Sequence, residues 1–185
     1  HRFGVAQREQ LTQKSAHAHT LVMTATPIPR SLALSLYGDL EVSVLDELPP
    51  GRLPVRTALR TPDRRERIFA FVAEQVAAGR QTYVVYPTIE ESEESELLSA
   101  ETAYDELSKG ALSGLRVELI HGRLSTEEKR STMARFAAGE TDVLIATTVI
   151  EGGVDGANAT EMVIEHAERF GLAQLHQLRG RVGRG

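Results

Sequence analysis

Arginine and glycine dominate the end of the chain, from Gln177 to Gly185. On a helix, Gln177, Arg181 and Arg184 stand at i, i+4 and i+7, so one amide and two permanent positive charges would share a face. Arginine forms paired hydrogen bonds to phosphate oxygens and stabilises the charge that develops when a phosphoryl group is transferred. The spacing therefore predicts a polyphosphate-binding helix face, and a solvated basic helix end is the simpler alternative.

Two pairs of threonines stand where predicted strands end. Thr24 and Thr26 lie within the three residues before Pro27, and Thr147 and Thr148 close another apolar run. Hydroxyl groups at such positions can bond to phosphate, which positions a nucleic acid without reading its sequence. Taken alone, a Thr-x-Thr-Pro sequence is more often a simple helix cap. A Thr-Thr pair in a strand is explained equally well by the high strand propensity of threonine.

A third candidate is the loop that begins at His121-Gly122. It follows a predicted strand and precedes the capping box Ser125-Thr126-Glu127-Glu128, so it would bring helix N-terminal amides to the carboxyl edge of a sheet, where anions bind. A lone histidine is more often structural than catalytic, and no Ser, Cys or metal-ligand partner is spaced to use this one. We expect an anion-binding loop and no metal site.

The elements that must position these residues follow a βαβ pattern, because short apolar runs alternate with amphipathic stretches. We expect a parallel sheet with strands at residues 19–23, 82–86, 117–120, 143–147 and 162–165. Thr61 and Pro62 predict the start of a helix that ends at Gly79, and the capping box starts another that ends at Gly139. The acidic run 90–96 is most simply a solvated loop or a first helical turn.

Composition limits the class of protein. The chain has 185 residues, of which 41% are apolar, and this suffices for a packed core. No apolar run approaches the roughly 20 residues that cross a bilayer. The absence of cysteine excludes a disulfide framework and suits a reducing compartment. A net charge of −5 argues against coating nucleic acid through bulk charge, although local patches can still hold DNA.

Taken together, the motifs resemble those of superfamily 2 helicases: TATP at 24–27, TTVIE at 147–151 and the closing Q-x-x-G-R-x-G-R match motifs III, V and VI. Four longer stretches, LVMTATPIPR, YGDL followed by DELPPG, HGR, and AERFGLAQLHQLRGRVGRG, narrow the resemblance to RecG-type ATP-dependent DNA helicases. Mfd-type translocases share TATPIPR and FGLAQLHQLRGRVGR, but DELPPG is not expected in them. The resemblance covers nearly the whole chain and implies an α/β fold, a RecA-like parallel sheet flanked by helices as in P-loop NTPase lobes.

The resemblance also implies roles for individual residues. Arg184 would be the arginine finger, Arg181 the γ-phosphate partner and Gln177 their companion, while Asp155 and Gly153 would lie near the nucleotide. The implied DNA contacts are His121, Gly122, Arg123, Thr147 and Thr148, and the implied coupling residues are Thr24, Ala25, Thr26 and Glu151.

The segment after Glu151 departs from the family pattern. Gly152, Gly156 and Ala157 stand where RecG-type sequences are expected to have Val, Val and Pro. If the native geometry is unchanged, each change costs about 0.5 to 1 kcal/mol because the unfolded chain is freer. This departure would affect how efficiently ATP hydrolysis is coupled to movement on DNA.

Pro49-Pro50-Gly51 and Pro54 interrupt the order of elements, so we expect residues 1–52 to be the tail of one RecA-like lobe and 53–185 most of a second. No phosphate-cradling G-x-x-x-x-G-K-[ST] occurs, and the acidic pair expected before His1 in RecG is absent. We therefore expect that this chain is an excerpt and that another lobe supplies the phosphate loop and the Mg²⁺ ligands for ATP. The excerpt alone is not expected to hydrolyse ATP.

The function that the resemblance implies is ATP-dependent translocation on branched or duplex DNA in recombination and repair. Its partners would be DNA, ATP and the remaining domains of the same polypeptide, including one that recognises junctions. The location would be the cytoplasm of a bacterium, at the nucleoid. The alternatives are an Mfd-like translocase and a non-hydrolysing DNA-binding or protein-interaction module derived from a helicase lobe.

Overall fold

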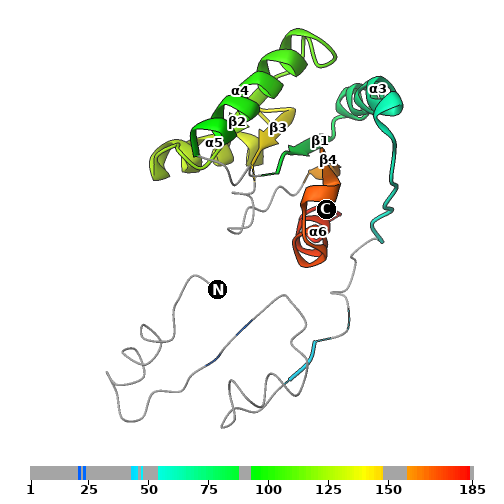
Figure 1. The fold of residues 1–185 in the computed structure, drawn as a ribbon, viewed down its shortest axis with the longest axis vertical. Helices are drawn as coiled ribbons and strands as arrows, with labels where there is room; N and C mark the ends of the chain where they lie inside the picture. Colours follow the sequence, from blue (N-terminus) through cyan, green and yellow to red (C-terminus); the bar gives the residue numbers. More distant parts are fainter. Residues whose placement is uncertain are drawn as a thin grey trace. The chain divides into compact units, whose positions relative to one another are not determined.

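The structure is a computed structural model that describes residues 54–87, 93–147 and 158–183, together with Leu21, Met23, residues 43–45 and Glu47. At residues 93–99 it describes the backbone alone. The chain divides into two compact units, residues 1–43 and 44–185, and nearly all described residues belong to the second. Figure 1 shows the helices and strands of that unit. The predicted lobe boundary between residues 52 and 53 stays a prediction.

The second unit is built on a parallel sheet in the order β2-β3-β1-β4 (Figure 1). Its strands are β1 (Gln81–Val85), β2 (Val117–Ile120), β3 (Val143–Ala146) and β4 (Ala159–Ile164). The strand predicted at 117–120 is confirmed without change, and those at 82–86 and 143–147 are confirmed to within one residue. The strand predicted at 162–165 begins earlier, at Ala159.

Helices cover both faces of this sheet because successive strand residues point to opposite sides. Tyr83 and Val85 pack with Phe136 of α5 (Thr126–Ala137) and Leu178 of α6 (Leu172–Arg179). Val84 packs on the other face, in a cluster that also contains residues of α3 (Arg65–Ala77) and α4 (Glu93–Lys109). The result is a three-layer sandwich whose central strand, β1, is buried at every residue.

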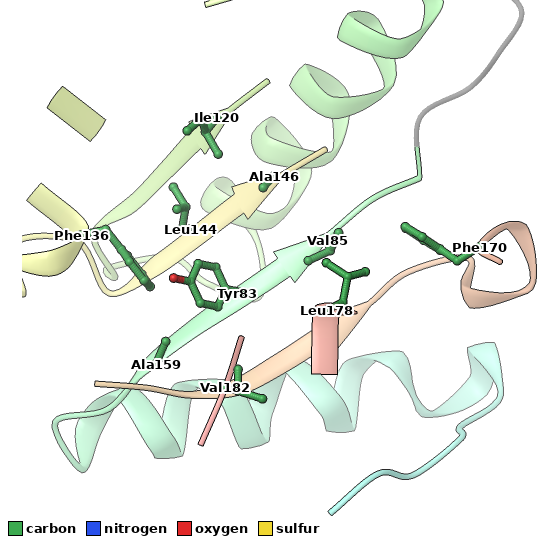
Figure 2. Packing of buried hydrophobic residues seen from close by; sticks show 10 residues of the cluster. All are labelled: Tyr83, Val85, Ile120, Phe136, Leu144, Ala146, Ala159, Phe170, Leu178 and Val182. Carbon is green, nitrogen blue, oxygen red and sulfur yellow. The ribbon is translucent and has the colours of Figure 1, made fainter. Parts of the chain in front are cut away.

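Tyr83 lies at the middle of the first of these clusters, as Figure 2 shows. Its ring is tilted against that of Phe136, with 4.8 Å between the ring centroids. Aromatic pairs at this separation stabilise the folded state by more than the burial of their apolar area alone. The contact fixes α5, and therefore the loop that precedes it, against β1.

The predicted helix boundaries are largely confirmed. A 3-10 turn, η1 (Pro62–Arg64), comes before α3, and Thr61 precedes it without a side-chain capping bond, so the predicted hydroxyl cap is absent. Gly79 follows α3 at φ 82° and Gly139 follows α5 at φ 76°, the left-handed conformation that glycine adopts readily. α4 begins at Glu93, which makes residues 93–96 of the acidic run a first helical turn.

Two predictions about elements are wrong. Leu21 and Met23 fall in the strand predicted at 19–23, yet both are in irregular backbone with side chains 80% and 77% exposed. A strand of a covered parallel sheet buries such residues. The helix predicted to carry Arg184 on one face with Gln177 also fails, because α6 ends at Arg179.

Further short helical and extended segments complete the described part. η3 (Ala167–Arg169) links β4 to α6, and an extended segment at residues 54–60 leads to η1. In the described residues, no helix is long and apolar enough to cross a membrane.

At the amino edge of the sheet, Arg116 and Asp142 join the starts of β2 and β3. The Arg116 backbone N–H donates to Asp142 Oδ2 at 2.8 Å, and its Nε donates to the same oxygen at 3.1 Å. Burial acts to raise the pKa of the Asp142 carboxyl, but the hydrogen bonds and charge of Arg116 outweigh it and hold that pKa below its usual range. The carboxylate is thus bound as the charged form.

We expect Asp142→Asn to lower the free energy of unfolding at neutral pH, measured by urea denaturation of the 185-residue chain. A depressed folded-state pKa contributes stability that is present above the unfolded pKa and lost as pH falls through the folded one. The difference between the two proteins should therefore be full above about pH 5 and shrink below about pH 4. Asp105→Asn, which alters an exposed pair with Lys109 on α4, is the control and should change little. A difference that stays constant down to pH 3 would contradict the role of the Asp142 charge.

Candidate functional site

The carboxyl ends of the four strands lie in register. Ala146 of β3 is the partner of both Ile120 and Val85, and Val85 is also the partner of Ile164. The next residue of each strand therefore falls in a single row across the edge of the sheet. That row consists of His121, Thr147, Tyr86 and Glu165.

Backbone hydrogen bonds continue the ladder into this row. Tyr86 N–H donates to the carbonyl of Ala146 at 2.8 Å, and Glu165 N–H donates to the carbonyl of Val85 at 2.9 Å. Thr147 N–H donates to the carbonyl of Ile120 at 3.3 Å. The row is thus part of the rigid sheet, at the edge where open α/β sheets bind their ligands.

Two polar atoms of the row are buried without a hydrogen-bond partner. These are Oγ1 of Thr147, a residue only 1% exposed, and Nδ1 of His121. A buried polar atom without a partner costs about 1 to 3 kcal/mol, so such atoms are uncommon and each one needs a reason. A bound water or a ligand oxygen at the carboxyl edge would satisfy these two atoms, and other such atoms lie away from this edge, in Gln81, Thr82 and Thr141.

The loop after His121 is held by the start of α5. The Ser125 backbone N–H donates to Glu128 Oε2 at 2.8 Å, and Glu128 N–H donates to Ser125 Oγ at 3.2 Å, which confirms the capping box. These hydrogen bonds hold the pKa of Glu128 below its usual range, with a smaller contribution from His121. Lys129 Nζ donates to the carbonyl of Gly122, so the loop is fixed at both ends.

Gly122 has a conformation and surroundings that do not require glycine. A Cβ added there would meet nothing within 4 Å, and its φ is not positive. Arg123, its neighbour, is exposed. The fold does not explain this glycine, whereas the close approach of a ligand backbone would.

The arginine motif, which starts at Gln177, begins on α6 and continues into the turn after this helix. Leu178 and Val182 are buried and attach the helix and the turn after it to the core. Gly180 caps α6, Arg181 N–H donates to the carbonyl of Leu178 at 2.9 Å, and Gly183 is left-handed at φ 72°. Gln177 is therefore on the helix and Arg181 in the turn, both half-buried.

The structure describes only some of the predicted site residues. His121 and Thr147 share the row at the sheet edge, Gly122 and Arg123 follow in the loop, and Gln177 and Arg181 belong to the α6 segment. The predictions for Thr24, Ala25, Thr26, Thr148, Glu151, Gly153, Asp155 and Arg184 lie outside the described residues, as do Gly152, Gly156 and Ala157. Within the described residues, no group of three or more His, Cys, Asp and Glu side chains could hold a metal ion.

Sequence reasoning missed three residues that meet at the same edge. Arg65, the first residue of α3, donates from Nε to Glu165 at 2.9 Å and from Nη2 to the hydroxyl of Tyr86 at 3.4 Å. Burial and the charge of Glu165 raise the pKa of Tyr86 to about 12, so its hydroxyl stays protonated at neutral pH. One signal was available, since Tyr86 and Glu165 are each the last residue of a predicted strand.

The sheet order, the covering helices and the row of polar residues at the carboxyl edge define a RecA-like lobe of the helicase type. Residues 63–185 match the helicase conserved C-terminal domain family, and the chain belongs to it. The predicted fold class is thereby confirmed.

Individual relatives are RecG helicases. The whole chain is 56% identical over 185 residues to the ATP-dependent DNA helicase RecG of Thermotoga maritima, covering 24% of that protein, and 55% identical over 190 residues to RecG of Escherichia coli K12, covering 27% of it. A solved structure of RecG bound to a three-way DNA junction superposes with a TM-score of 0.72 and 53% identity, over 87% of this chain and 21% of that one. The chain thus spans about a quarter of the length of the curated relatives that it matches.

We expect Gly122→Ala to leave the free energy of unfolding unchanged or to raise it by about 0.4 to 1 kcal/mol, because the position accepts a side chain and the unfolded chain loses freedom. Gly139→Ala is the matched control. It places alanine at a left-handed φ and should lower stability by about 1 kcal/mol. Urea denaturation of both variants measures the difference, and a clear loss in Gly122→Ala would mean that the fold itself requires this glycine.

Proposed function

We propose that this chain is part of the motor of a RecG-like ATP-dependent DNA helicase that acts on branched DNA in recombination and repair. The observation that carries the proposal is identity above 50% to RecG helicases along the whole chain, with the motif Q-x-x-G-R-x-G-R intact. The junction-bound structure of one relative supports branched DNA as the substrate. Cycles of ATP binding and hydrolysis would move two lobes along the duplex.

ATP would lie against the α6 segment. Gln177 and Arg181 would contact its phosphates, Arg184 would stabilise the charge of the transferring phosphoryl group, and Gly153 and Asp155 would border the nucleotide. Guanidinium groups suit this role because they stay charged and bind phosphate oxygens in pairs. The phosphate loop and the Mg²⁺ ligands would come from the other RecA-like lobe of the same polypeptide.

DNA would lie across the carboxyl edge of the sheet. The unpartnered atoms of His121 and Thr147 support phosphate contacts there, with Thr148 beside them. Gly122 would let the DNA backbone come close, and Arg123 would add a charge. Contacts of this kind position the protein on DNA without selecting a sequence.

Coupling between the two sites would run through Glu151, next to the threonines, and through Thr24, Ala25 and Thr26 at the end of the first lobe. A domain that recognises junctions would complete the protein. We further propose a location in the bacterial cytoplasm, at the nucleoid, because that is where such a substrate occurs.

Arg184→Ala in the full-length protein should reduce DNA-stimulated ATP hydrolysis by about three orders of magnitude or more, since an arginine finger contributes that much to phosphoryl transfer. Steady-state hydrolysis with and without synthetic fork DNA measures it. Arg80→Ala is the control, because Arg80 lies at the opposite edge of the sheet, where it pairs with Glu161. An unmutated protein that binds forks without hydrolysing ATP would instead favour the non-hydrolysing module.

Arg123→Ala and Gly122→Ala should both weaken fork binding, for different reasons. Loss of one phosphate contact from Arg123 should weaken binding equally on all sequences and reduce the slope of log affinity against log salt by about one. A methyl group at Gly122 should weaken binding while leaving that slope unchanged. Fork titrations at several salt concentrations separate the two, and unaltered affinity in both variants would remove this loop from the DNA site.

A further inference from the structure

One side chain joins four elements on the α3 and α4 face of the sheet. The guanidinium of Arg65 donates to Glu165 at the end of β4, to Tyr86 at the end of β1 and, at 2.7 Å, to Glu106 of α4. It also stands over the ring of Phe69, 5.0 Å from the centroid. A planar group with fixed donors holds such partners at set angles, which a flexible ammonium does not.

Two carboxylates, those of Glu165 and Glu106, need the positive charge of Arg65. The Glu165 side chain is only 18% exposed, and Arg65 Nε and Glu165 Oε1 are 2.9 Å apart. A half-buried carboxylate is costly without a partner, and Glu106 brings a second carboxylate to the same guanidinium. Although burial acts to lower the pKa of Arg65, its hydrogen bonds to Glu165, Glu106 and Tyr86 raise it above the usual value, so the charge is permanent.

Glu165 is also the residue at which the chain leaves the sheet on its way to the arginine motif. After Glu165 the chain turns through His166, which is left-handed at φ 52°, and passes η3 before α6 begins. Glu165 N–H is bonded to the carbonyl of Val85, so its backbone and its side chain are both attached at the strand ends. Phe170, Leu178 and Val182 hold the later part of this segment in the core (Figure 2).

We propose that Arg65 is a positioning residue for the arginine motif: it fixes Glu165 at the sheet edge and thereby sets where α6 presents Gln177 and where the turn after α6 presents Arg181. This role rests on the proposed function. It predicts that loss of Arg65 slows the chemical step more than it weakens the binding of ATP or DNA. A displacement of about 1 Å in a catalytic group can cost a hundredfold in rate.

A second ion pair in the chain provides a matched control. Arg135 of α5 donates from Nε to Glu118 of β2 at 2.7 Å and from Nη2 to the same carboxylate at 3.1 Å. The side chains of this pair are 42% exposed for Arg135 and 26% for Glu118, which is similar to the 34% of Arg65 and the 18% of Glu165. This pair also joins a helix to a strand, but β2 is separated from β4, and so from Glu165, by two strands.

The test compares Arg65→Ala, Arg65→Lys, Glu165→Gln and Arg135→Ala in the full-length protein. The measurements are kcat and KM for ATP at saturating fork DNA, fork affinity, and the thermal midpoint. We expect Arg65→Ala to lower kcat about ten- to a hundredfold with KM and fork affinity within about twofold of the unmutated protein. Arg65→Lys restores the charge and should recover part of kcat. Arg135→Ala should lower the thermal midpoint similarly while kcat stays unchanged.

The double variant Arg65→Ala with Glu165→Gln adds a direct check of the route. If Arg65 acts through Glu165, kcat in the double variant should equal that of Arg65→Ala alone, because residues of one network are not additive.

Several outcomes would overturn the proposed role of Arg65. If Arg65→Ala keeps the kcat of the unmutated protein, or if kcat falls with the thermal midpoint equally in Arg65→Ala and Arg135→Ala, the role of Arg65 is structural only. Should Arg65→Ala fail to fold, unaltered kcat in both Arg65→Lys and Glu165→Gln would overturn the proposal. An unmutated protein without DNA-stimulated turnover would instead overturn the proposed function, and with it this role.

Discussion

The burial of β1 on both faces is the constraint from which the rest of the unit follows. Because every residue of this strand is covered, helices must pack above and below it, and neighbouring strands must satisfy its backbone on both sides. Val85 is thereby aligned with Ala146 and Ile164, and Ala146 with Ile120, so four chain segments leave the sheet at one level. The chemistry at the carboxyl edge is a consequence of core packing.

Local patterns predicted the elements well where one segment decides its own structure. The apolar run at 117–120 and the capping box at Ser125 depend on neighbours in sequence, and both were located correctly. The end of α6 was not, because Gly180, which caps the helix after Arg179, keeps a right-handed conformation, and a left-handed glycine follows only at Gly183. Arg65 was missed for another reason: its partner Glu165 is 100 residues away in the sequence.

Polar residues at the sheet edge serve two different purposes, and their partners tell them apart. Tyr86 and Glu165 are bonded within the lobe, so they act on its geometry. Thr147 and His121 have buried polar atoms for which no described residue provides a partner, so a water or ligand that entered this edge would satisfy them. One edge of the sheet thus has a part beneath α3 whose polar groups are bonded within the lobe and a part beside α5 whose buried polar atoms lack partners, and the DNA contacts that we propose are on the latter.

The strand order has a consequence for how the chain folds. β1 and β2 are consecutive among the described strands but are not neighbours, since β3 lies between them. During synthesis, β1 and β2 would emerge without a common hydrogen-bonded partner until β3, at Val143–Ala146, has left the ribosome. Assembly of the sheet therefore waits for a contact that is distant in sequence, and two apolar strands have unpaired backbone meanwhile.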